Sequence, residues 1–396
     1  MSVFWCSRCV YPSSAAISLT FDDEKVCSGC RVAERNAPDS DIDWEERKHL
    51  LKETILESQK KDDYYDCIVG VSGGKDSYFQ THVIKNELGL KPLLVTYYGN
   101  NYLPEGDYNL RRMADVFDVD HMIFKPSVGT LHKLNRLGFT LMGDMNWHNH
   151  CGIYTVPVRE AVRHDIPVAL YGEHGRTHIG GMFSLDDMIE LTSRYVHEHV
   201  CRGYTWEDMV SADSTLTKAD LLFTIYPDDD ELDDLGFRGI FMGFYLLWKP
   251  NEHAEFVMSE FGWKPREEPF ERTYRKISNL DDMHENGIHD YLKFIKFGYG
   301  RCTDHASKDI RDGLLTRDEA VELVRNRDHV KSKDLDRWLD YVGMSEEEFD
   351  RICDSFRDPR VWWKDEKGAW CKHDIWDDEG MRRKKEKARL RATNRL

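Results

Sequence analysis

Short apolar segments alternate with longer amphipathic segments through the middle of the chain. The apolar segments predict four strands, at 67–71, 92–97, 121–124 and 168–171. The segments between them predict helices, most clearly at 76–88 and 107–117. Apolar strands that are joined through helices form parallel sheets with helices on both faces. The pattern therefore predicts an α/β fold built on a parallel sheet.

The segments outside this alternation are charged and helical. Residues 31–62 carry one apolar stripe, which predicts a helical connector. After about residue 280, two capping boxes predict helix starts at Thr316 and Ser345. The most apolar run, 239–248, is about half as long as a bilayer span requires, so we expect a buried strand or helix there.

The first predicted strand runs directly into a turn that contains two adjacent glycines, Gly73 and Gly74. Because neither residue has a Cβ, the backbone amides of this turn can approach a phosphate closely. The helix that follows directs its unpaired N-terminal amides and the positive end of its dipole at the same anion. Ser72 and Ser77 add hydroxyl donors. The turn therefore predicts a binding site for the phosphates of a nucleotide.

Two charged side chains accompany this turn. Asp76 would repel a phosphate unless a divalent cation lay between the two groups, so we expect Mg²⁺ on Asp76. Lys75 either pairs with phosphate as a point charge or is a solvated side chain of the first helical turn. The string S-G-G-x-D-S after a strand resembles the PP-loop of the ATP pyrophosphatases, which have an adenine nucleotide α-hydrolase-like fold. Enzymes of that family cleave ATP between the α and β phosphates and transfer AMP to a substrate oxygen. A glycine turn without a ligand is the alternative interpretation.

Ligands of parallel sheets bind beyond the carboxyl ends of the strands, at the switch point of the topology. We therefore expect the Ser72 loop, Tyr97 and the segment 171–176 to surround one crevice. Tyr97 either lines an adenine pocket or is an ordinary aromatic residue at a strand end. Glu173, beside Gly172, is a candidate catalytic group and a second ligand for metal or substrate.

Four cysteines near the N-terminus form two CxxC pairs. Seventeen residues separate Cys6-x-x-Cys9 from Cys27-x-x-Cys30, a spacing typical of two knuckles that close on one structural zinc ion. The segment between the pairs has few apolar residues, so metal binding would supply folding energy on the order of 10 kcal/mol. Disulfides and an iron–sulfur cluster are the alternatives.

Charge and composition exclude some functions. A chain of 396 residues with a net charge of −17 is poorly suited to binding nucleic acid over a broad surface. The one basic block, 382–391, is either a solvated helix end or a contact for RNA or an acidic partner. The N-terminus has no basic flank and no apolar signal core, so we expect a cytoplasmic protein that makes no membrane contact.

A second resemblance rests on the PP-loop, the cysteine ribbon and three further segments, 146–152, 172–174 and 293–311. Together they resemble the N-acetyl sugar amidotransferase family of surface-polysaccharide synthesis. The resemblance implies an enzyme that adenylates an acetamido oxygen of a sugar acid, which is nucleotide-linked or nonulosonic, and replaces it with ammonia. It also implies ATP, Mg²⁺ and structural Zn²⁺. The resemblance further implies that the ammonia for this reaction comes from a glutaminase and a barrel subunit that resemble the two halves of imidazole glycerol phosphate synthase.

The later segments contain candidate substrate-binding side chains. The basic side chains of 293–311 would suit a sugar carboxylate or diphosphate, or they form a solvated helix face. With other polar residues, they give the following candidate substrate-binding residues: His174, Arg176, Lys296, Arg301, Asp304 and Lys308. Asp304 and His305 either order the site and relay protons or pack in the core. His148, His150 and Cys151 have the composition of a metal site, and they either orient ATP or substrate or have a core role.

Two other functions compete with this interpretation. Related PP-loop enzymes thiolate tRNA by adenylating a base, and a reactive cysteine then delivers sulfur; the available cysteines here are Cys67, Cys151, Cys201 and Cys302. A zinc-ribbon adaptor with a degenerate nucleotide site is the third possibility, which the intact S-G-G-x-D-S string disfavours. The predicted organisation is a four-cysteine ribbon at 1–40, a connector at 41–62, the PP-loop domain at 63–275 and a helical C-terminal region with a basic tail at 276–396.

Overall fold

The computed structural model describes residues 3–59, 64–277 and 284–393. Its centre is a six-stranded sheet with the strand order β3-β2-β1-β4-β6-β5. Five strands are parallel, and β5 pairs antiparallel with β6 at one edge. The bounds are β1 Cys67–Gly70, β2 Pro92–Tyr97, β3 His121–Phe124, β4 Val168–Tyr171, β5 Glu190–Leu191 and β6 Arg238–Phe241. The predicted α/β fold with a parallel sheet is confirmed.

The buried strands account for the apolar segments of the sequence. Every residue of β2 and β4 is buried, as are Cys67, Ile68 and Val69 of β1. The four predicted strands are all present, and only β1 is one residue shorter than predicted. The apolar run 239–248 contains most of β6 and a short 3-10 helix, Met242–Phe244. The two-residue strand β5 gave no signal in the sequence because so short a segment has no period.

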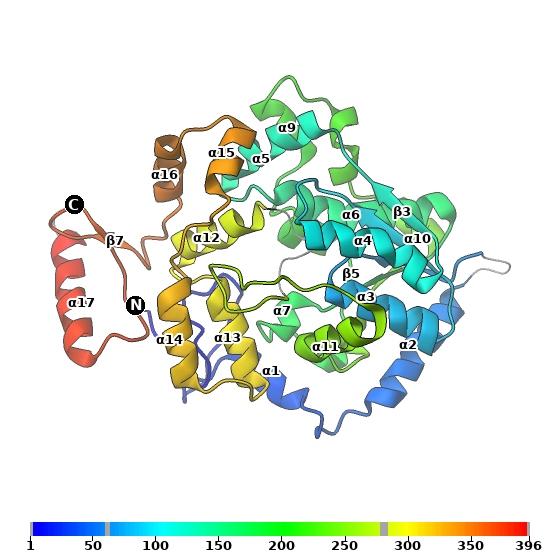
Figure 1. The fold of residues 1–396 in the computed structure, drawn as a ribbon, viewed down its shortest axis with the longest axis horizontal. Helices are drawn as coiled ribbons and strands as arrows, with labels where there is room; N and C mark the ends of the chain where they lie inside the picture. The colour runs from blue at the N-terminus through cyan, green and yellow to red at the C-terminus, as the bar shows by residue number, and fades with distance from the viewer. Residues whose placement is uncertain (1–2, 60–63, 278–283, 394–396) are drawn as a thin grey trace.

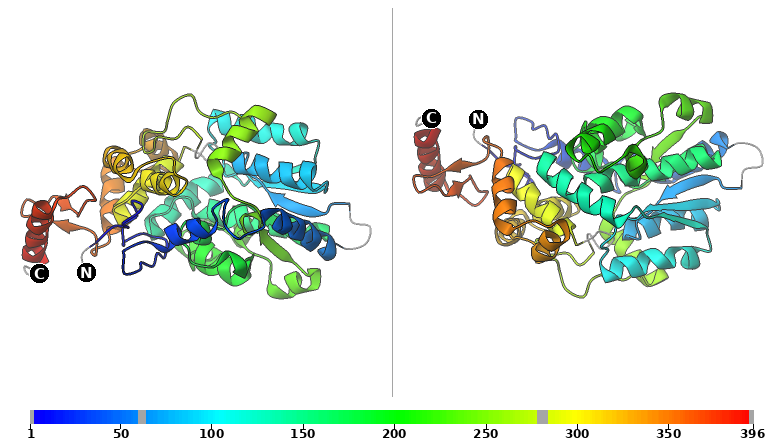
Figure 2. Two further views of the ribbon diagram at one scale, coloured as in Figure 1. Left: turned by 90° about the horizontal axis from the view of Figure 1, so that it is seen from below. Right: turned by 90° about the horizontal axis from the view of Figure 1, so that it is seen from above.

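Helices cover both faces of the sheet (Figures 1 and 2). The helix predicted at 76–88 is two elements, the α-helix α3 and a π-helix at Val83–Glu87. The helix predicted at 107–117 starts earlier, with a proline in its first turn. The helices of this region are α3 Lys75–His82, α4 Pro104–Phe117, α5 Val128–Met142, α6 Trp147–His164, α7 Gly175–His178, α8 Ser193–Tyr195, α9 Trp206–Ala212, α10 Asp229–Leu235 and α11 Pro250–Phe261.

The switch point of the sheet lies between β1 and β4. Strands β2 and β3 continue the sheet on one side of this pair, and β6 and β5 continue it on the other. The loop at Ser72 follows β1, and the segment at Gly172 follows β4. Both therefore emerge at the carboxyl-end edge of the sheet, and the region between these two segments is the expected ligand-binding crevice.

The N-terminal cysteine ribbon packs against the C-terminal helices beside the sheet, whereas the helix at residues 44–58 packs on the sheet domain through Leu51 and Ile55 (Figure 1). The N-terminal part holds the cysteine ribbon, α1 Ser28–Arg35 and α2 Trp44–Ser58. The C-terminal part holds α12 Asn286–Phe297, α13 Arg301–Arg311, α14 Arg317–Arg327, α15 Leu335–Val342, α16 Glu346–Ser355, the hairpin β7 Trp363–Lys364 and β8 Trp370–Cys371, and α17 Glu379–Thr393. The capping box at Thr316 forms both of its hydrogen bonds, whereas Ser345 accepts only the one from the Glu348 amide.

The ribbon is held by the C-terminal helices. The Arg317 guanidinium donates to the backbone oxygens of Cys6 and Cys9, at 3.2 and 3.3 Å. The Tyr11 hydroxyl donates to Asp304 of α13 at 2.8 Å. The basic tail forms α17, and Lys385 pairs there with Asp374 and Asp377. The predicted domain limits stay predictions, and the one at 62–63 lies outside the described residues.

Within the described ranges, we find no helix with the length and apolar character that a bilayer span requires.

Candidate functional site

The Ser72 loop has the backbone geometry of a phosphate cradle. Gly73 has φ +89°, and a Cβ on this residue would lie 2.7 Å from the Cα of Leu110. Gly74 is the N-cap of α3, and no side chain caps this helix. A helix start at which no side chain of the described residues acts as a cap is a typical binding position for an anion.

Two hydrogen bonds fix the conformation of the Ser72 loop. The Ser72 amide donates to the Ser77 hydroxyl at 2.9 Å, which closes the turn on itself. The Trp263 indole donates to the Gly73 carbonyl at 3.0 Å. The Gly73 carbonyl is therefore fixed on the indole. The structure thus brings together Ser72, Gly73, Gly74 and Ser77 as the sequence predicted, in a preformed loop.

Asp76 lies in the first turn of α3 between two nitrogen groups. Its Oδ2 pairs with Lys75 Nζ at 2.8 Å, and its Oδ1 lies 3.0 Å from Nδ1 of His253. Burial would raise the pKa of Asp76, but the Lys75 ammonium and the His253 hydrogen bond together hold that pKa well below its usual value. The side chain is 32% exposed, so the carboxylate is ionised and accessible to a cation.

His253 is positioned by aromatic packing. Its ring stacks on Phe79 with centroids 3.7 Å apart and meets Trp248 edge-on. It lies 177 positions from Asp76 along the chain, and no motif in the sequence marked it. This positioning group for Asp76 was therefore missed in the sequence.

Glu173 follows β4 and pairs across the crevice with the C-terminal region. Lys308 of α13 donates to both of its carboxylate oxygens, at 2.9 and 3.1 Å. Burial and the charge of Asp76 raise the pKa of Glu173, while Lys308 and His178 lower it, and the net shift is downward. Asp76 and Glu173 follow the adjacent parallel strands β1 and β4, so both acids lie at the same edge of the sheet.

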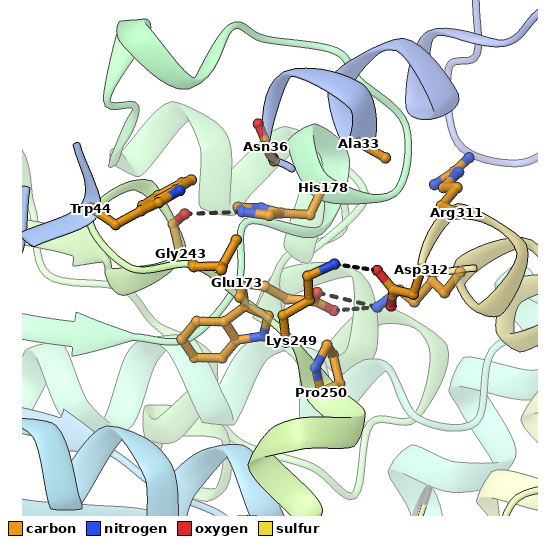
Figure 3. Close-up of a pocket in the computed structure, with 13 residues that line it drawn as sticks. Ala33, Asn36, Trp44, Glu173, His178, Gly243, Lys249, Pro250, Arg311 and Asp312 are labelled. Carbon is orange, nitrogen blue, oxygen red and sulfur yellow. Dashed lines mark hydrogen bonds and ion pairs between the residues drawn. The ribbon is translucent and has the colours of Figure 1, made fainter. Parts of the chain in front are cut away.

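A small cavity of about 70 Å³ adjoins this ion pair (Figure 3). Its wall includes Glu173 and Lys308, and a second pair, Lys249 and Asp312, lies 2.6 Å apart beside it. The cavity wall also includes His178, whose Nε2 donates to the Gly243 carbonyl at 3.0 Å. Both ion pairs join the sheet domain to α13 or the residue just after it. The C-terminal region therefore forms part of this cavity, whose lining among the described residues does not include residues 72–77.

The structure places two predicted ligand-binding residues in the core instead. Tyr97 is 3% exposed, and its hydroxyl lies 2.9 Å from Nδ1 of His148. His174 is fully buried and caps α7, with Nδ1 2.8 Å from the Thr177 hydroxyl. His148 is also fully buried and lies 3.0 Å from the Asn135 amide. The strand-end and core interpretations of these rings fit this packing, and the ligand-binding assignments of Tyr97 and His174 stay predictions.

The other predicted substrate-binding residues divide between several places. Lys296 donates to the Gly143 carbonyl at 2.9 Å, and burial lowers its pKa to about 8. Arg301 pairs with Asp290 at 2.7 Å, and Asp304 accepts from Lys293 and Tyr11. Of the predicted set, Lys308 is at the crevice, whereas Arg301 and Asp304 belong to a buried charge network. Arg176, on α7, lies next to buried His174.

The four N-terminal cysteines form one buried cluster with the geometry of a metal site. All four Sγ atoms lie within 4.8 Å of one another. The Cys9–Cys27 and Cys6–Cys30 Sγ separations are 3.7 and 4.0 Å, too long for disulfides. Four sulfurs at about 2.3 Å from one tetrahedral ion would be about 3.8 Å apart. The separations therefore fit a single ion better than a cluster whose thiolates sit on different irons.

Helix α13 connects this cluster to the crevice. The Arg311 guanidinium contacts the Cys27 sulfur at 3.5 Å and donates to the Ile179 carbonyl at 3.0 Å. One turn earlier on the same helix, Lys308 holds Glu173. A loss of order in the cluster would thus reach the crevice through one short helix.

Gly73→Ala tests the backbone requirement of the loop. The left-handed φ and the approach to Leu110 predict a loss of about 1–3 kcal/mol in the free energy of unfolding, together with loss of ATP binding. Gly89→Ala is the matched control, because Gly89 has φ +69° and no atom of the described residues lies within 4 Å of an added Cβ; it should lower the free energy of unfolding by about 1 kcal/mol. Urea unfolding and calorimetric ATP titration measure both effects. Equal losses in the free energy of unfolding for the two variants would contradict the close approach of Gly73 to Leu110.

Comparisons with known proteins find similarity over parts of this chain. Residues 256–375 match the family model "LPS biosynthesis protein WbpG-like, C-terminal domain". Among curated proteins, the Uncharacterized protein MJ1599 of Methanocaldococcus jannaschii is 27% identical over 118 residues, which cover 30% of this chain. The chain spans about two-fifths of the length of that relative, 41%.

Solved structures give weaker similarity. An NH3-dependent NAD synthetase from Campylobacter jejuni is 14% identical with a TM-score of 0.29, and the match covers 49% of this chain and 92% of the synthetase. The U34-tRNA thiolase NcsA from Methanococcus maripaludis is 12% identical with a TM-score of 0.28, over 86% of this chain and 96% of the thiolase. These values are too low to transfer an activity.

Proposed function

We propose that this protein is an ATP-dependent amidotransferase of surface-polysaccharide biosynthesis. It adenylates an acetamido oxygen of a sugar acid, nucleotide-linked or nonulosonic, and replaces that oxygen with ammonia. The observation that carries the proposal is the uncapped Ser72-Gly73-Gly74 loop at the switch point, with Asp76 beside it. The match of residues 256–375 to a lipopolysaccharide biosynthesis family supports the pathway.

The chemistry requires activation of the substrate oxygen. An amide carbonyl is a poor electrophile, and ammonia cannot expel its oxygen as hydroxide. In the proposed reaction the acetamido oxygen attacks the α-phosphate of ATP and pyrophosphate leaves. Ammonia then attacks the imidate carbon, and AMP leaves with the original oxygen. Amide, ATP and ammonia thus give amidine, AMP and pyrophosphate, and no protein nucleophile is required.

The loop residues have assigned roles in this reaction. The amides of Gly73, Gly74 and the start of α3 would bind the phosphates, with the Ser72 and Ser77 side chains beside them. A bound magnesium ion neutralises the phosphate charge that builds during transfer. Asp76 is its proposed ligand, because its ionised carboxylate is partly exposed beside the cradle and His253 fixes its orientation. Lys75 supplies a further positive charge.

Glu173 and Lys308 are proposed to face the substrate. Their ion pair crosses the crevice at 2.9 Å, so a sugar carboxylate could take the place of Glu173 on the Lys308 ammonium. Gly172 keeps this wall close to α3, since an added Cβ would lie 2.9 Å from the Gln80 side-chain nitrogen. Ammonia is proposed to come from a glutaminase and a barrel subunit, and the partners of this chain are part of the proposal.

The competing function is tRNA thiolation, which needs an accessible sulfur carrier. The four candidate cysteines are all buried, with exposures of 0 to 6%: Cys67, Cys151, Cys201 and Cys302. Burial raises the pKa of Cys67 and of Cys302, so those thiols are not activated as nucleophiles. These observations favour the amidotransferase.

Incubation of the protein with ATP, Mg²⁺, ammonium and a panel of UDP-diacetamido sugar acids and nonulosonic acids tests the proposal. We expect AMP and pyrophosphate together with a product lighter by about one mass unit, because NH replaces O. Mass spectrometry detects the product. Sulfur incorporation into tRNA under matched conditions, with no change in any sugar of the panel, would contradict the amidotransferase and favour tRNA thiolation.

A further inference from the structure

A second group of candidate metal ligands lies where α5, α6 and α12 meet. Asp144 is in the turn between α5 and α6, His150 is in the first turn of α6, and His289 is in the first turn of α12. One ligand atom from each residue lies within 4.8 Å of the other two. The three residues come from two distant parts of the chain, and the fold brings them to one point.

The separations between these atoms are those of ligands around one ion. His150 Nδ1 lies 3.3 Å from Asp144 Oδ2, and His289 Nε2 lies 3.6 Å from Asp144 Oδ1. Two ligands at about 2.0–2.1 Å from a tetrahedral ion are about 3.4 Å apart. Both observed separations exceed the usual 2.7–3.2 Å range of an N–H···O hydrogen bond.

The donor groups are fixed by their surroundings. Asp144 is fully buried, and its Oδ1 accepts from the Asn146 amide at 3.1 Å. Its backbone oxygen packs against Gly138, where a Cβ would lie 2.4 Å away. His289 lies beside Asp290, which pairs with Arg272 and Arg301. The His289 Nδ1 lies 3.9 Å from Asp290 Oδ1, a distance too long for a hydrogen bond, so Asp290 acts on His289 through its charge.

The group is reachable from solvent. The His150 and His289 side chains are 30% and 21% exposed, while Asp144 is fully buried behind them. Two imidazoles and one carboxylate leave at least one coordination position open, as in catalytic zinc sites and non-haem iron sites. A fully thiolate site such as the cysteine cluster has no such position.

Two cationic side chains oppose a metal ion here. Arg202 Nη2 lies 2.6 Å from Asp144 Oδ2, and Lys296 donates to the Gly143 carbonyl next to Asp144. Arg202 is 36% exposed, so its side chain can move toward solvent. Asp144 Oδ2 lies 3.3 Å from His150 Nδ1, so an ion bound by this oxygen and His150 requires Arg202 to move away from Asp144. Arg202 is therefore expected to weaken metal binding without preventing it.

We propose that Asp144, His150 and His289 bind a divalent first-row transition metal ion, with an open coordination position toward solvent. The donor set suits Zn²⁺, Co²⁺ or Fe²⁺ and is too rich in nitrogen for Mg²⁺ or Ca²⁺. The site is separate from the cysteine cluster and from the Ser72 loop, and the proposal does not depend on the amidotransferase reaction.

Cobalt titration of the full-length protein tests the proposal. The protein is first loaded with zinc at the cysteines and freed of weakly bound metal with EDTA. We expect the wild type to bind one further equivalent of Co²⁺, with visible d–d absorption and no thiolate charge-transfer band. His289→Gln should lower the affinity at least 10-fold, and it should keep the zinc on the cysteines.

Two further variants make the result interpretable. His284→Gln is the matched control, because His284 is a partly exposed histidine near α12 that pairs with Asp334 instead of Asp144. It should bind Co²⁺ as the wild type does. Arg202→Met removes the competing cation and should tighten binding about 10-fold. A wild type that takes up no cobalt beyond the cysteines, or equal affinities for all four proteins, would overturn the proposal.

Discussion

Asp76→Ala is expected to abolish ATP cleavage, lowering the rate of AMP formation by at least about 10³-fold. Asp76 is the one carboxylate in the first turn of α3, and it lies between Lys75 and His253. Without it the phosphates face the loop without their bridging cation. Its loss creates no cavity in the apolar core, because the side chain is 32% exposed at the edge of the crevice. The fold is therefore expected to survive.

The assay follows AMP by chromatography, with circular dichroism and thermal unfolding as checks on the fold. Asp234→Asn is the matched control, since Asp234 is an exposed aspartate of α10 away from the crevice, and it should retain full activity. Wild-type AMP release by a folded Asp76→Ala protein would remove Asp76 from the mechanism.

Cys9→Ser should have the largest effect on stability. The four sulfurs are buried in the apolar cluster formed with Tyr11, Val26 and Tyr299, so loss of one ligand leaves buried thiols without an ion. Metal sites of this kind contribute on the order of 10 kcal/mol to folding. We expect one equivalent of zinc and most of the soluble protein to be lost together. Loss of the cluster should also disorder α13 through the contact of Arg311 with Cys27.

The control for this variant is Cys371→Ser. Cys371 is on β8, is partly exposed and lies outside the cluster, so its serine variant should keep both zinc and solubility. Elemental analysis and size-exclusion chromatography report the two quantities. A well-folded Cys9→Ser protein without metal would rule out a structural ion.

The fold was largely predictable because its signals are local. Strands β2, β3 and β4 were predicted at their observed limits, since short, uninterrupted apolar runs between polar turns are typical of strands in a parallel sheet. The π-helix at Val83–Glu87 was missed because it continues the apolar face of α3 without a break in the pattern. Strand β5 is too short to produce a pattern at all.

The candidate site could be predicted only where its residues are contiguous in the sequence. The loop from Ser72 to Ser77 contains its own turn, hydroxyls and carboxylate, and so it could be found in the sequence. His253 and Trp263, which fix that loop from α11 and the segment after it, are reached only through the tertiary fold. The burial of Tyr97 and His174 could not be predicted for the same reason. A residue at a strand end faces either the crevice or the adjacent helix, and a single sequence does not distinguish the two.

Oxygen labelling tests the central claim most directly. A sugar acid carrying ¹⁸O in its acetamido group is incubated with the protein, ATP, Mg²⁺ and ammonium, and the nucleotide products are weighed by mass spectrometry. If the acetamido oxygen attacks the α-phosphate, AMP becomes heavier by about two mass units and pyrophosphate stays unlabelled. Label in inorganic phosphate together with ADP, or unlabelled AMP beside an amidine product, would contradict transfer of AMP to that oxygen.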